Sequence, residues 1–359
     1  VVRGWSWQYV FYCSAGWILL MGVIAMIFYR EPPRDADAES RRSLGEVFAG
    51  MVAVVGNGRF FLLVAGMLLL LVMGSRWLDP AQYLPAAVGW LVLNFFWDQT
   101  CCRRASAEGT WLLQPMQVGE GRYLIFLVLM AFFWTSFNQI FMTLPEYIRD
   151  YADTSDLIHS MGPVANWITG VAQSMGLNTA EWGRAVLEHG QVKPEHLINL
   201  NALGIIVGQV AIAYSVRKLA PLTCIILGSF ITVISFLLYL IGQGGWVIVI
   251  AILVFSIGEM LASPRSKEYA GNIAPPNKVG MYMGYFYWCV ALGNLFGGLL
   301  SGQMYEHFGP VDRGGVDNPG VMWVIFAGLA MVSVVLLWVY DKWVGARPQK
   351  PAGAAPVAG

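Results

Sequence analysis

Long apolar runs, separated by short polar connections, dominate the pattern of residues along this chain. Nine runs reach or approach the roughly 20 residues that cross a lipid bilayer as a helix. They cover residues 5–29, 60–73, 83–97, 123–147, 197–216, 222–241, 246–262, 281–304 and 321–340. The second and third runs are the shortest, and each alone is also consistent with a buried core helix or a re-entrant segment. The turn between them, from Gly74 to Pro80, favours a helical hairpin that crosses and returns.

Composition places the chain in a membrane independently of these runs. Hydrophobic residues make up 57% of the 359 residues, charged residues make up 12%, and the mean hydropathy is +0.57. A soluble fold of this length does not normally hide so much apolar surface in one core. The 22 basic and 22 acidic residues balance, so no basic field is present to attract nucleic acid. We expect the lipid bilayer, and not nucleic acid, to be a partner.

The positions of lysine and arginine predict the orientation of the helices. If the first run exits into the cytoplasm, the cytoplasmic connections carry 16 of the 22 basic residues and the outside connections carry 6. Cytoplasmic connections of membrane proteins are enriched in Lys and Arg, and the reversed orientation fails this rule. We therefore expect a multi-pass protein of the cell inner (plasma) membrane with a cytoplasmic C-terminus.

A lone carboxylate, that of Glu259, interrupts the apolar run 246–262. An ionisable group at such a depth costs several kcal/mol unless it serves a pathway or finds a partner. A rise of 1.5 Å per residue places Glu259 about 20 Å along the helix from Trp246, past the midplane but within the hydrocarbon core. A functional role is favoured over the alternative, in which Glu259 is hydrogen-bonded to neighbouring helices or paired with Lys267.

The residues around Glu259 resemble a known family. Residues 258–264 read Gly-Glu-Met-Leu-Ala-Ser-Pro, and they are followed by Tyr269, Ala274-Pro275 and a glycine-punctuated run over 280–302. This order is similar to the tenth and eleventh helices of the proton-coupled oligopeptide transporters, a branch of the major facilitator superfamily. Residues 4–11, Gly-Trp-Ser-Trp-Gln-Tyr-Val-Phe, resemble the start of the sixth helix, and bacterial members carry a two-helix hairpin between helices six and seven.

The resemblance implies an all-α integral membrane fold. It consists of the major facilitator C-terminal six-helix bundle, the last helix of the N-terminal half and an inserted two-helix hairpin. Five preceding helices, which complete the N-terminal bundle and half of the midplane substrate site, are expected to be missing from this chain. The expected division is a last N-half helix at 1–29, a cytoplasmic linker at 30–59, the hairpin at 60–97, a second cytoplasmic linker at 98–121, the six-helix bundle at 122–342 with an external cap at 150–196, and a disordered cytoplasmic tail at 343–359.

The resemblance also implies a set of substrate-binding residues. Residues 132–141 are similar to the aromatic seventh helix of the family, with Gln139 at the cavity face and Asn138 where many relatives place an acid. Asn201 resembles an asparagine at the entry of helix eight, and Tyr285 lies near the family's usual tryptophan. The candidate substrate-binding residues are Glu259, Gln139, Asn138, Asn201, Tyr285, Trp288 and Trp134. For the three amides, interhelical hydrogen bonding worth roughly 0.6–2 kcal/mol is the alternative explanation.

Glycine spacing predicts where helices approach closely. Three pairs lie four residues apart in the eleventh helix of the family pattern, and close packing is the favoured explanation for them. Alternatively, these glycines provide surfaces along which the helices slide during transport. The pairs are Gly280 and Gly284, Gly293 and Gly297, and Gly298 and Gly302.

The longest outside connection, residues 149–196, departs from the family resemblance. Two short helical patterns lie within it, at 163–174 and, after the candidate cap Asn178, at 179–189. We interpret the connection as an external cap over the vestibule, with a solvated surface loop as the alternative.

No chemistry other than transport is indicated. His159, His189, His196 and His307 fall on outside connections without metal-ligand spacing, and the five cysteines lack the two-residue spacing of zinc or redox sites. The sequence has no glycine-rich phosphate loop, and no second catalytic group accompanies Glu259 at depth. We therefore expect no enzyme activity, no metal and no cofactor.

The function implied by the resemblance is secondary active transport, as proton-coupled symport of di- or tripeptides by alternating access. Glu259 would meet the amino terminus of the peptide, while Gln139, Asn201 and Tyr285 line the pocket. A carboxylate in a low-dielectric cavity is stabilised by a proton or by a bound ammonium, which couples the two. The alternatives are a major facilitator symporter of another small solute, such as a sugar, nucleoside or drug, and a non-transporting membrane receptor or scaffold.

Overall fold

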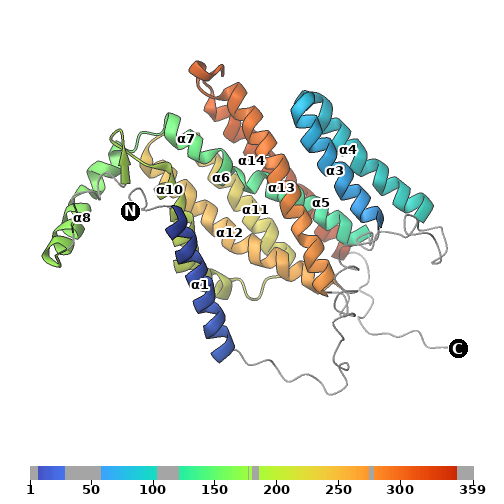
Figure 1. Ribbon diagram of the computed structural model, residues 1–359, viewed down its shortest axis with the longest axis horizontal. Coiled ribbons are helices and arrows are strands. Elements are labelled where there is room, and N and C mark those ends of the chain that lie inside the picture. Colours follow the sequence, from blue (N-terminus) through green and yellow to red (C-terminus); the bar gives the residue numbers. More distant parts are fainter. Residues whose placement is uncertain are drawn as a thin grey trace.

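The computed structural model describes residues 7–28, 58–102, 121–176, 178–179, 186–274 and 279–345, which are almost entirely helical (Figure 1). All nine predicted apolar runs fall on helices. These are α1 (Trp7–Phe28), α3 (Gly58–Trp77), α4 (Pro80–Trp97), the consecutive α5 (Gly121–Phe137), α6 (Gln139–Met142) and α7 (Leu144–Tyr151), then α10 (Pro194–Ser215), α11 (Pro221–Leu238), α12 (Gly245–Ile273), α13 (Val279–Phe308) and α14 (Pro319–Gly345). Within the described residues, seven segments are long and apolar enough to cross a membrane. The all-α membrane fold is confirmed.

Several predicted boundaries differ from the observed ones. The helix around Glu259 continues well past 262, through Pro264, to Ile273. The predicted linker 98–121 begins with a π-helical turn, η2 (Asp98–Cys102), and the predicted tail begins with the last helical residues of α14. Residues 29–57, 103–120 and 346–359, which hold most of the predicted linkers and tail, lie outside the described residues.

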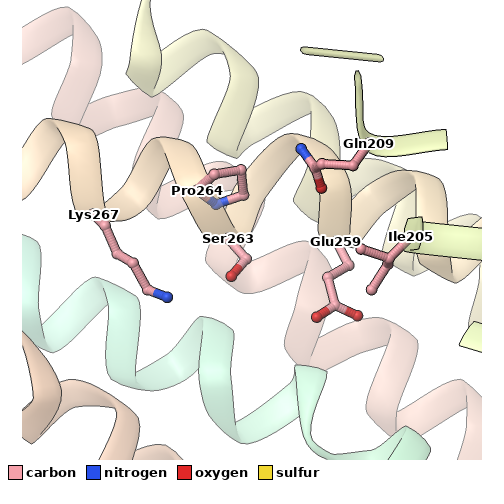
Figure 2. A pocket seen from close by; sticks show the side chains of 6 residues that line it. All are labelled: Ile205, Gln209, Glu259, Ser263, Pro264 and Lys267. Carbon is pink, nitrogen blue, oxygen red and sulfur yellow. The ribbon is translucent and has the colours of Figure 1, made fainter. Parts of the chain in front are cut away.

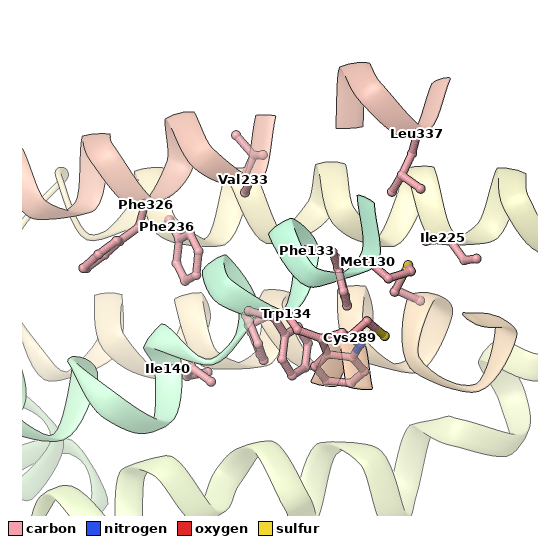
Figure 3. Packing of buried hydrophobic residues seen from close by; sticks show 14 of the residues in the cluster. Met130, Phe133, Trp134, Ile140, Ile225, Val233, Phe236, Cys289, Phe326 and Leu337 are labelled. Carbon is pink, nitrogen blue, oxygen red and sulfur yellow. The ribbon is translucent and has the colours of Figure 1, made fainter. Parts of the chain in front are cut away.

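Aromatic side chains fill the interior of the bundle. Trp323 of α14 is fully buried and stacks on Tyr239, with ring centroids 4.2 Å apart. Phe236 of α11 and Phe255 of α12 are also fully buried, with centroids 6.2 Å apart. Figure 3 shows side chains from α5, α11, α13 and α14 meeting in this core. Because lipid is as apolar as these side chains, their fit to one another matters more here than water exclusion does.

Helices α11 and α12 touch through two glycines. A Cβ atom placed on Gly258 would lie 2.7 Å from the carbonyl oxygen of Gly228 and 3.0 Å from Thr232 Oγ1. A Cβ atom placed on Gly228 would in turn lie 2.5 Å from the carbonyl oxygen of Gly258. The two backbones are therefore in direct contact, which small residues at a membrane helix crossing permit.

A second close approach joins α13 to α5. A Cβ atom on Gly293 would overlap the Cβ of Trp134, and one on Gly297 would lie 3.2 Å from the carbonyl oxygen of Thr135. These two glycines, four residues apart, thus let α13 pack closely against α5, as the sequence predicts. Gly302, from another predicted pair, would place its Cβ in open space within the described structure. A role of the glycines in movement stays a prediction.

The span predicted at 123–147 is a helix in three pieces. α5 ends at Phe137, and α6 is separated from α7 at Thr143. Pro145 lies in the first turn of α7, where its missing N–H is tolerated, whereas the same residue inside a helix removes a hydrogen bond. The interruptions lie beside Gln139, so polar backbone and polar side chains meet in the middle of the bundle.

Helices α3 and α4 form a hairpin. Trp90 of α4 lies against Gly66 of α3, and its Nε1 donates to the carbonyl oxygen of Leu63 at 2.9 Å. The apolar stretch of α3, Phe61–Gly74, is shorter than a full span. The hairpin packs beside α13 (Figure 1), where it contacts Leu292, Leu295, Phe296 and Leu299.

The described residues of the connection between α7 and α10 form the helix α8 and a small hairpin. α8 (Ser155–Ser174) includes the helix predicted at 163–174. β1 (Leu187–Glu188) pairs with β2 (Gln191–Val192) in antiparallel fashion around His189 and Gly190, whose φ angles are 51° and 77°. Two consecutive positive φ angles form a hairpin turn. The helix predicted at 179–189 is therefore wrong at its C-terminal end, while 180–185 lie outside the described residues.

The first turn of α8 is fixed to the start of α12. The carboxylate of Asp156 accepts hydrogen bonds from the backbone N–H of Gly245 at 3.0 Å and of Trp246 at 3.2 Å. A carboxylate at a helix N-terminus is stabilised by the free N–H groups there. Nearby, the backbone N–H of Ser155 donates to Asp153 Oδ1 at 3.0 Å and lowers the pKa of that carboxyl below its ordinary value.

Candidate functional site

Glu259 lines a pocket of about 350 Å³ between α10 and α12. Its side chain is partly buried. Figure 2 shows the carboxylate pointing away from the helix axis into the pocket, with Lys267 further along α12. The lining residues are Ile205, Gln209, Glu259, Ser263, Pro264 and Lys267.

A hydrogen-bonded chain orients the carboxylate. Asn201 Nδ2 of α10 donates to Glu259 Oε2 at 2.9 Å. Ser256 Oγ donates to Asn201 Oδ1 at 2.6 Å and lies 2.8 Å from the carbonyl oxygen of Ile252. Because Ser256 occupies the amide oxygen, the amide nitrogen is directed at the carboxylate. The structure thus brings two of the predicted substrate-binding residues together and supplies a third that holds them in place.

Lys267 is the basic residue of the same helix that lines this pocket. It lies eight residues after Glu259, which corresponds to about 12 Å at 1.5 Å per residue. The ion pairs among described residues do not include one between the two side chains. The alternative of a Glu259–Lys267 pair is therefore absent from this part of the structure, whereas a hydrogen bond from a neighbouring helix is present.

Gln139 is fully buried and uses both ends of its amide. Its Nε2 donates to the carbonyl oxygens of Thr135 at 2.8 Å and Gly297 at 3.0 Å, and its Oε1 accepts from Thr143 Oγ1 at 2.7 Å. Thr143 Oγ1 also lies 2.8 Å from Ser301 Oγ of α13. These contacts join the broken seventh span to α13, as the interhelical alternative predicts.

Replacing Gln139 with leucine is expected to lower the free energy of unfolding by about 1–3 kcal/mol, because buried partners of the amide lose their hydrogen bonds. Thermal melting of the purified protein in detergent measures this effect. The matched control is Gln82→Leu at an exposed position of α4, which is expected to leave the melting temperature unchanged. Equal melting curves for the two variants would contradict a structural role for Gln139.

Asn138 and Trp134 lie close to Gln139 in the chain and are also buried. Asn138 Nδ2 and Trp134 Nε1 have no hydrogen-bond partner among the described residues. Buried donors are nearly always paired in folded proteins. These two groups are therefore available for a further hydrogen bond.

Tyr285 and Trp288 line a different cavity. It has a volume of about 880 Å³, is almost entirely apolar, and lies between the α3–α4 hairpin and helices α5 and α13. Leu63 and Phe96 come from the hairpin side, and Thr135 comes from α5. The structure does not bring these two aromatic residues into the pocket of Glu259.

Residues 165–358, more than half of the chain, match the model of the Major Facilitator Superfamily. The chain belongs to the Major Facilitator Superfamily. Two similar proteins of Bacillus subtilis (strain 168) are uncharacterized MFS-type transporters. YttB is 29% identical over 148 residues, which cover 41% of this chain and 35% of YttB. YqjV is 26% identical over 141 residues, which cover 39% of this chain and 33% of YqjV.

Solved structures with a similar course of the chain include a mutant of the peptide transporter POT, at a TM-score of 0.49 and 17% identity. The match covers 84% of this chain and 53% of that one. A POT family transporter in complex with 5-aminolevulinic acid matches at a TM-score of 0.48 and 15% identity, covering 90% of this chain and 60% of that one. The chain spans about a third of the length of the curated relatives and a little over half of these structures.

Within this Major Facilitator bundle, the site includes two serines that the sequence had not singled out for binding: Ser263 lines the pocket, and buried Ser256 holds Asn201. Ser256, Glu259, Ser263 and Lys267 are separated by three, four and four positions, which places them along one face of α12. This polar stripe along an apolar span is the sequence pattern from which Ser256 and Ser263 could have been identified. No group of three or more potential metal ligands occurs among the described residues.

Proposed function

We propose that the full-length protein is a secondary active transporter that moves di- or tripeptides with protons by alternating access. The observation that carries this proposal is the Glu259 carboxylate, which faces a pocket between α10 and α12 and is oriented by Asn201. An N-terminal helical bundle is proposed to complete the cavity. The proposed location is the cell inner membrane, with the C-terminus in the cytoplasm.

The chemistry of the pocket suits a cationic group. Asn201 donates one hydrogen bond to Glu259, and the other carboxylate oxygen, Oε1, makes no hydrogen bond within the described residues. A carboxylate away from bulk water is poorly solvated, so a proton or a substrate ammonium stabilises it strongly. The two compete for this carboxylate, so binding of one lowers the affinity for the other and links proton occupancy to substrate occupancy.

Two of the remaining candidates, Asn138 and Trp134, are proposed as contacts around the substrate. They support this through buried donors that have no partner in the described structure. Tyr285 and Trp288 line the separate apolar cavity beside α13, so they are not proposed as contacts of a substrate bound at Glu259. Gln139 contributes mainly by holding the broken helix against α13.

Uptake of a labelled dipeptide into proteoliposomes that hold the full-length protein tests the proposal. An inwardly directed proton gradient is expected to drive accumulation, and a protonophore is expected to abolish it. Uptake of a sugar, nucleoside or drug instead would favour another symporter of the superfamily. Binding of a solute without movement across the membrane would favour a receptor or scaffold.

Asn201→Ala is expected to lower peptide affinity about 5- to 20-fold, because Glu259 loses the donor that orients it. Ser256→Ala removes only the group that directs the amide, so a smaller loss of about 2- to 5-fold is expected. The dissociation constant of a dipeptide measures both effects. The matched control is Ser215→Ala, at the exposed end of α10, where the hydroxyl bonds only to Ala211 of its own helix. An Asn201 variant with the affinity of this control would argue against the proposed site.

A further inference from the structure

Helix α8 carries a continuous apolar stripe. Six apolar residues recur at intervals of three or four positions, which places them along one side of a helix. We call this set the apolar stripe: Leu157, Met161, Val164, Ile168, Val171 and, at the C-cap of the helix, Met175. The opposite face is polar and includes His159, Asn166, Thr169 and Gln173.

The stripe changes from buried to exposed along its length. Leu157, at the first turn, is only 5% exposed and lies against Gly245 at the start of α12. Met161 is 49% exposed, Ile168 is 47% exposed and Met175 is 73% exposed. Five large apolar side chains of the stripe, each 42–73% exposed, are therefore only partly covered by the described part of the chain. In water each would forgo the roughly 1.5–3 kcal/mol that full burial of such a side chain provides.

The position of α8 relative to α12 identifies what lies beside the stripe. Trp246, in the first turn of α12, donates from Nε1 to Ser160 Oγ of α8 at 3.0 Å. Because α12 is a membrane span, its first turn marks the boundary between lipid and water. α8 therefore begins at that boundary. Trp167, 69% exposed, flanks the stripe, and tryptophan is enriched at this depth in membrane proteins.

The direction of α8 points to the same surroundings. Figure 1 shows α8 leaving the end of the bundle where α7, α10 and α12 meet, and extending sideways beyond the other helices. Its 20 residues correspond to about 30 Å, so most of the helix lies beyond the helices that anchor it. The helix has no Lys or Arg. Its one carboxylate, that of Asp156, accepts a backbone hydrogen bond at the start of α12. The exposed part of α8 thus has one apolar and one polar face and carries no Lys or Arg.

We propose that α8 lies in the membrane–water interface, with the apolar stripe in contact with lipid acyl chains and the polar face in contact with water. Burial of apolar surface at the headgroup boundary is what holds an amphipathic helix in this position. Since α8 carries no Lys or Arg, its insertion does not require anionic lipid. The α7–α10 connection then anchors this end of the bundle at a fixed depth in the bilayer.

Spin labels on the two faces of α8 test the proposal. Cysteine is introduced at Ile168 on the stripe or at Asn166 on the polar face, in the full-length protein with its native cysteines replaced. Each labelled protein is reconstituted into vesicles of zwitterionic phosphatidylcholine. Collision of the label with oxygen, which concentrates in lipid, and with a water-soluble nickel chelate is measured by electron paramagnetic resonance. A second pair at Met161 and Thr169 repeats the measurement one or two turns away.

The stripe labels are expected to collide at least fivefold more with oxygen relative to the chelate than the polar-face labels do. Equal access of the chelate to both faces would overturn the proposal in favour of a solvated loop. Stripe labels shielded from both reagents would overturn it in favour of a protein contact, from another part of the protein or a second copy. The ratio is expected to stay the same when anionic phosphatidylglycerol is added, and a strong increase would contradict a neutral insertion.

Discussion

Replacing Gly258 with leucine is expected to abolish the native packing of α11 on α12, with a loss of about 3 kcal/mol in the free energy of unfolding. The first carbon of any side chain at this position would lie 2.7 Å from the carbonyl oxygen of Gly228. That neighbour is backbone and cannot turn aside as a flexible side chain does. The helices would have to separate along their whole crossing, and the aromatic core beyond it would lose its contacts.

The fraction of protein that elutes as a monodisperse peak after heating in detergent measures this loss. Gly328→Leu is the matched control, because it lies within α14 and a Cβ there would meet nothing within 4 Å. The control is expected to melt like the parent. Gly258→Leu protein as stable as the control would show that α11 and α12 do not touch at these glycines.

Replacing Glu259 with glutamine is expected to reduce proton-driven peptide uptake about 100-fold. Glutamine keeps the size of the side chain and can still accept the hydrogen bond from Asn201, so the fold is preserved. It carries no negative charge and no exchangeable proton at neutral pH. A charge-assisted hydrogen bond contributes about 1.5–3 kcal/mol, which corresponds to roughly 10- to 150-fold in affinity.

Glu268→Gln is the matched control for this substitution. Glu268 lies on the same helix, but it is exposed and pairs with Arg265 at 2.7 Å. Its replacement is expected to change uptake less than twofold, because exposed ion pairs contribute little. Similar activity of the two variants would exclude Glu259 from the transport pathway, provided that both proteins melt like the parent.

The helices could be predicted from the sequence because a span in lipid must be both apolar and long. The end of α12 could not, since Arg265, Lys267 and Glu268 end the apolar run without ending the helix. The hairpin at His189 and Gly190 was missed because a short polar segment with apolar residues also fits a helical period. In such segments the residues that favour a turn, and not the hydrophobic pattern, decide whether a hairpin or a helix forms.

The candidate site was predictable in part. Glu259 stood out because a charge in an apolar run is costly. Its contact with Asn201 spans 58 positions in the chain, so no local pattern reveals it. Tyr285 and Trp288 lie on a helix that is apolar on most sides, where periodicity does not tell which face meets the substrate pocket. The helix packing therefore places them in the other cavity.

A comparison of two ligands tests the proposal that Glu259 binds the amino group of a peptide. The dissociation constants of a dipeptide and of its analogue without the amino group are measured for the parent and for Glu259→Gln. The parent is expected to prefer the dipeptide by about 10- to 100-fold, and the variant is expected to bind both equally. A variant that keeps the preference of the parent would contradict the claim, because some other group would then recognise the amino terminus.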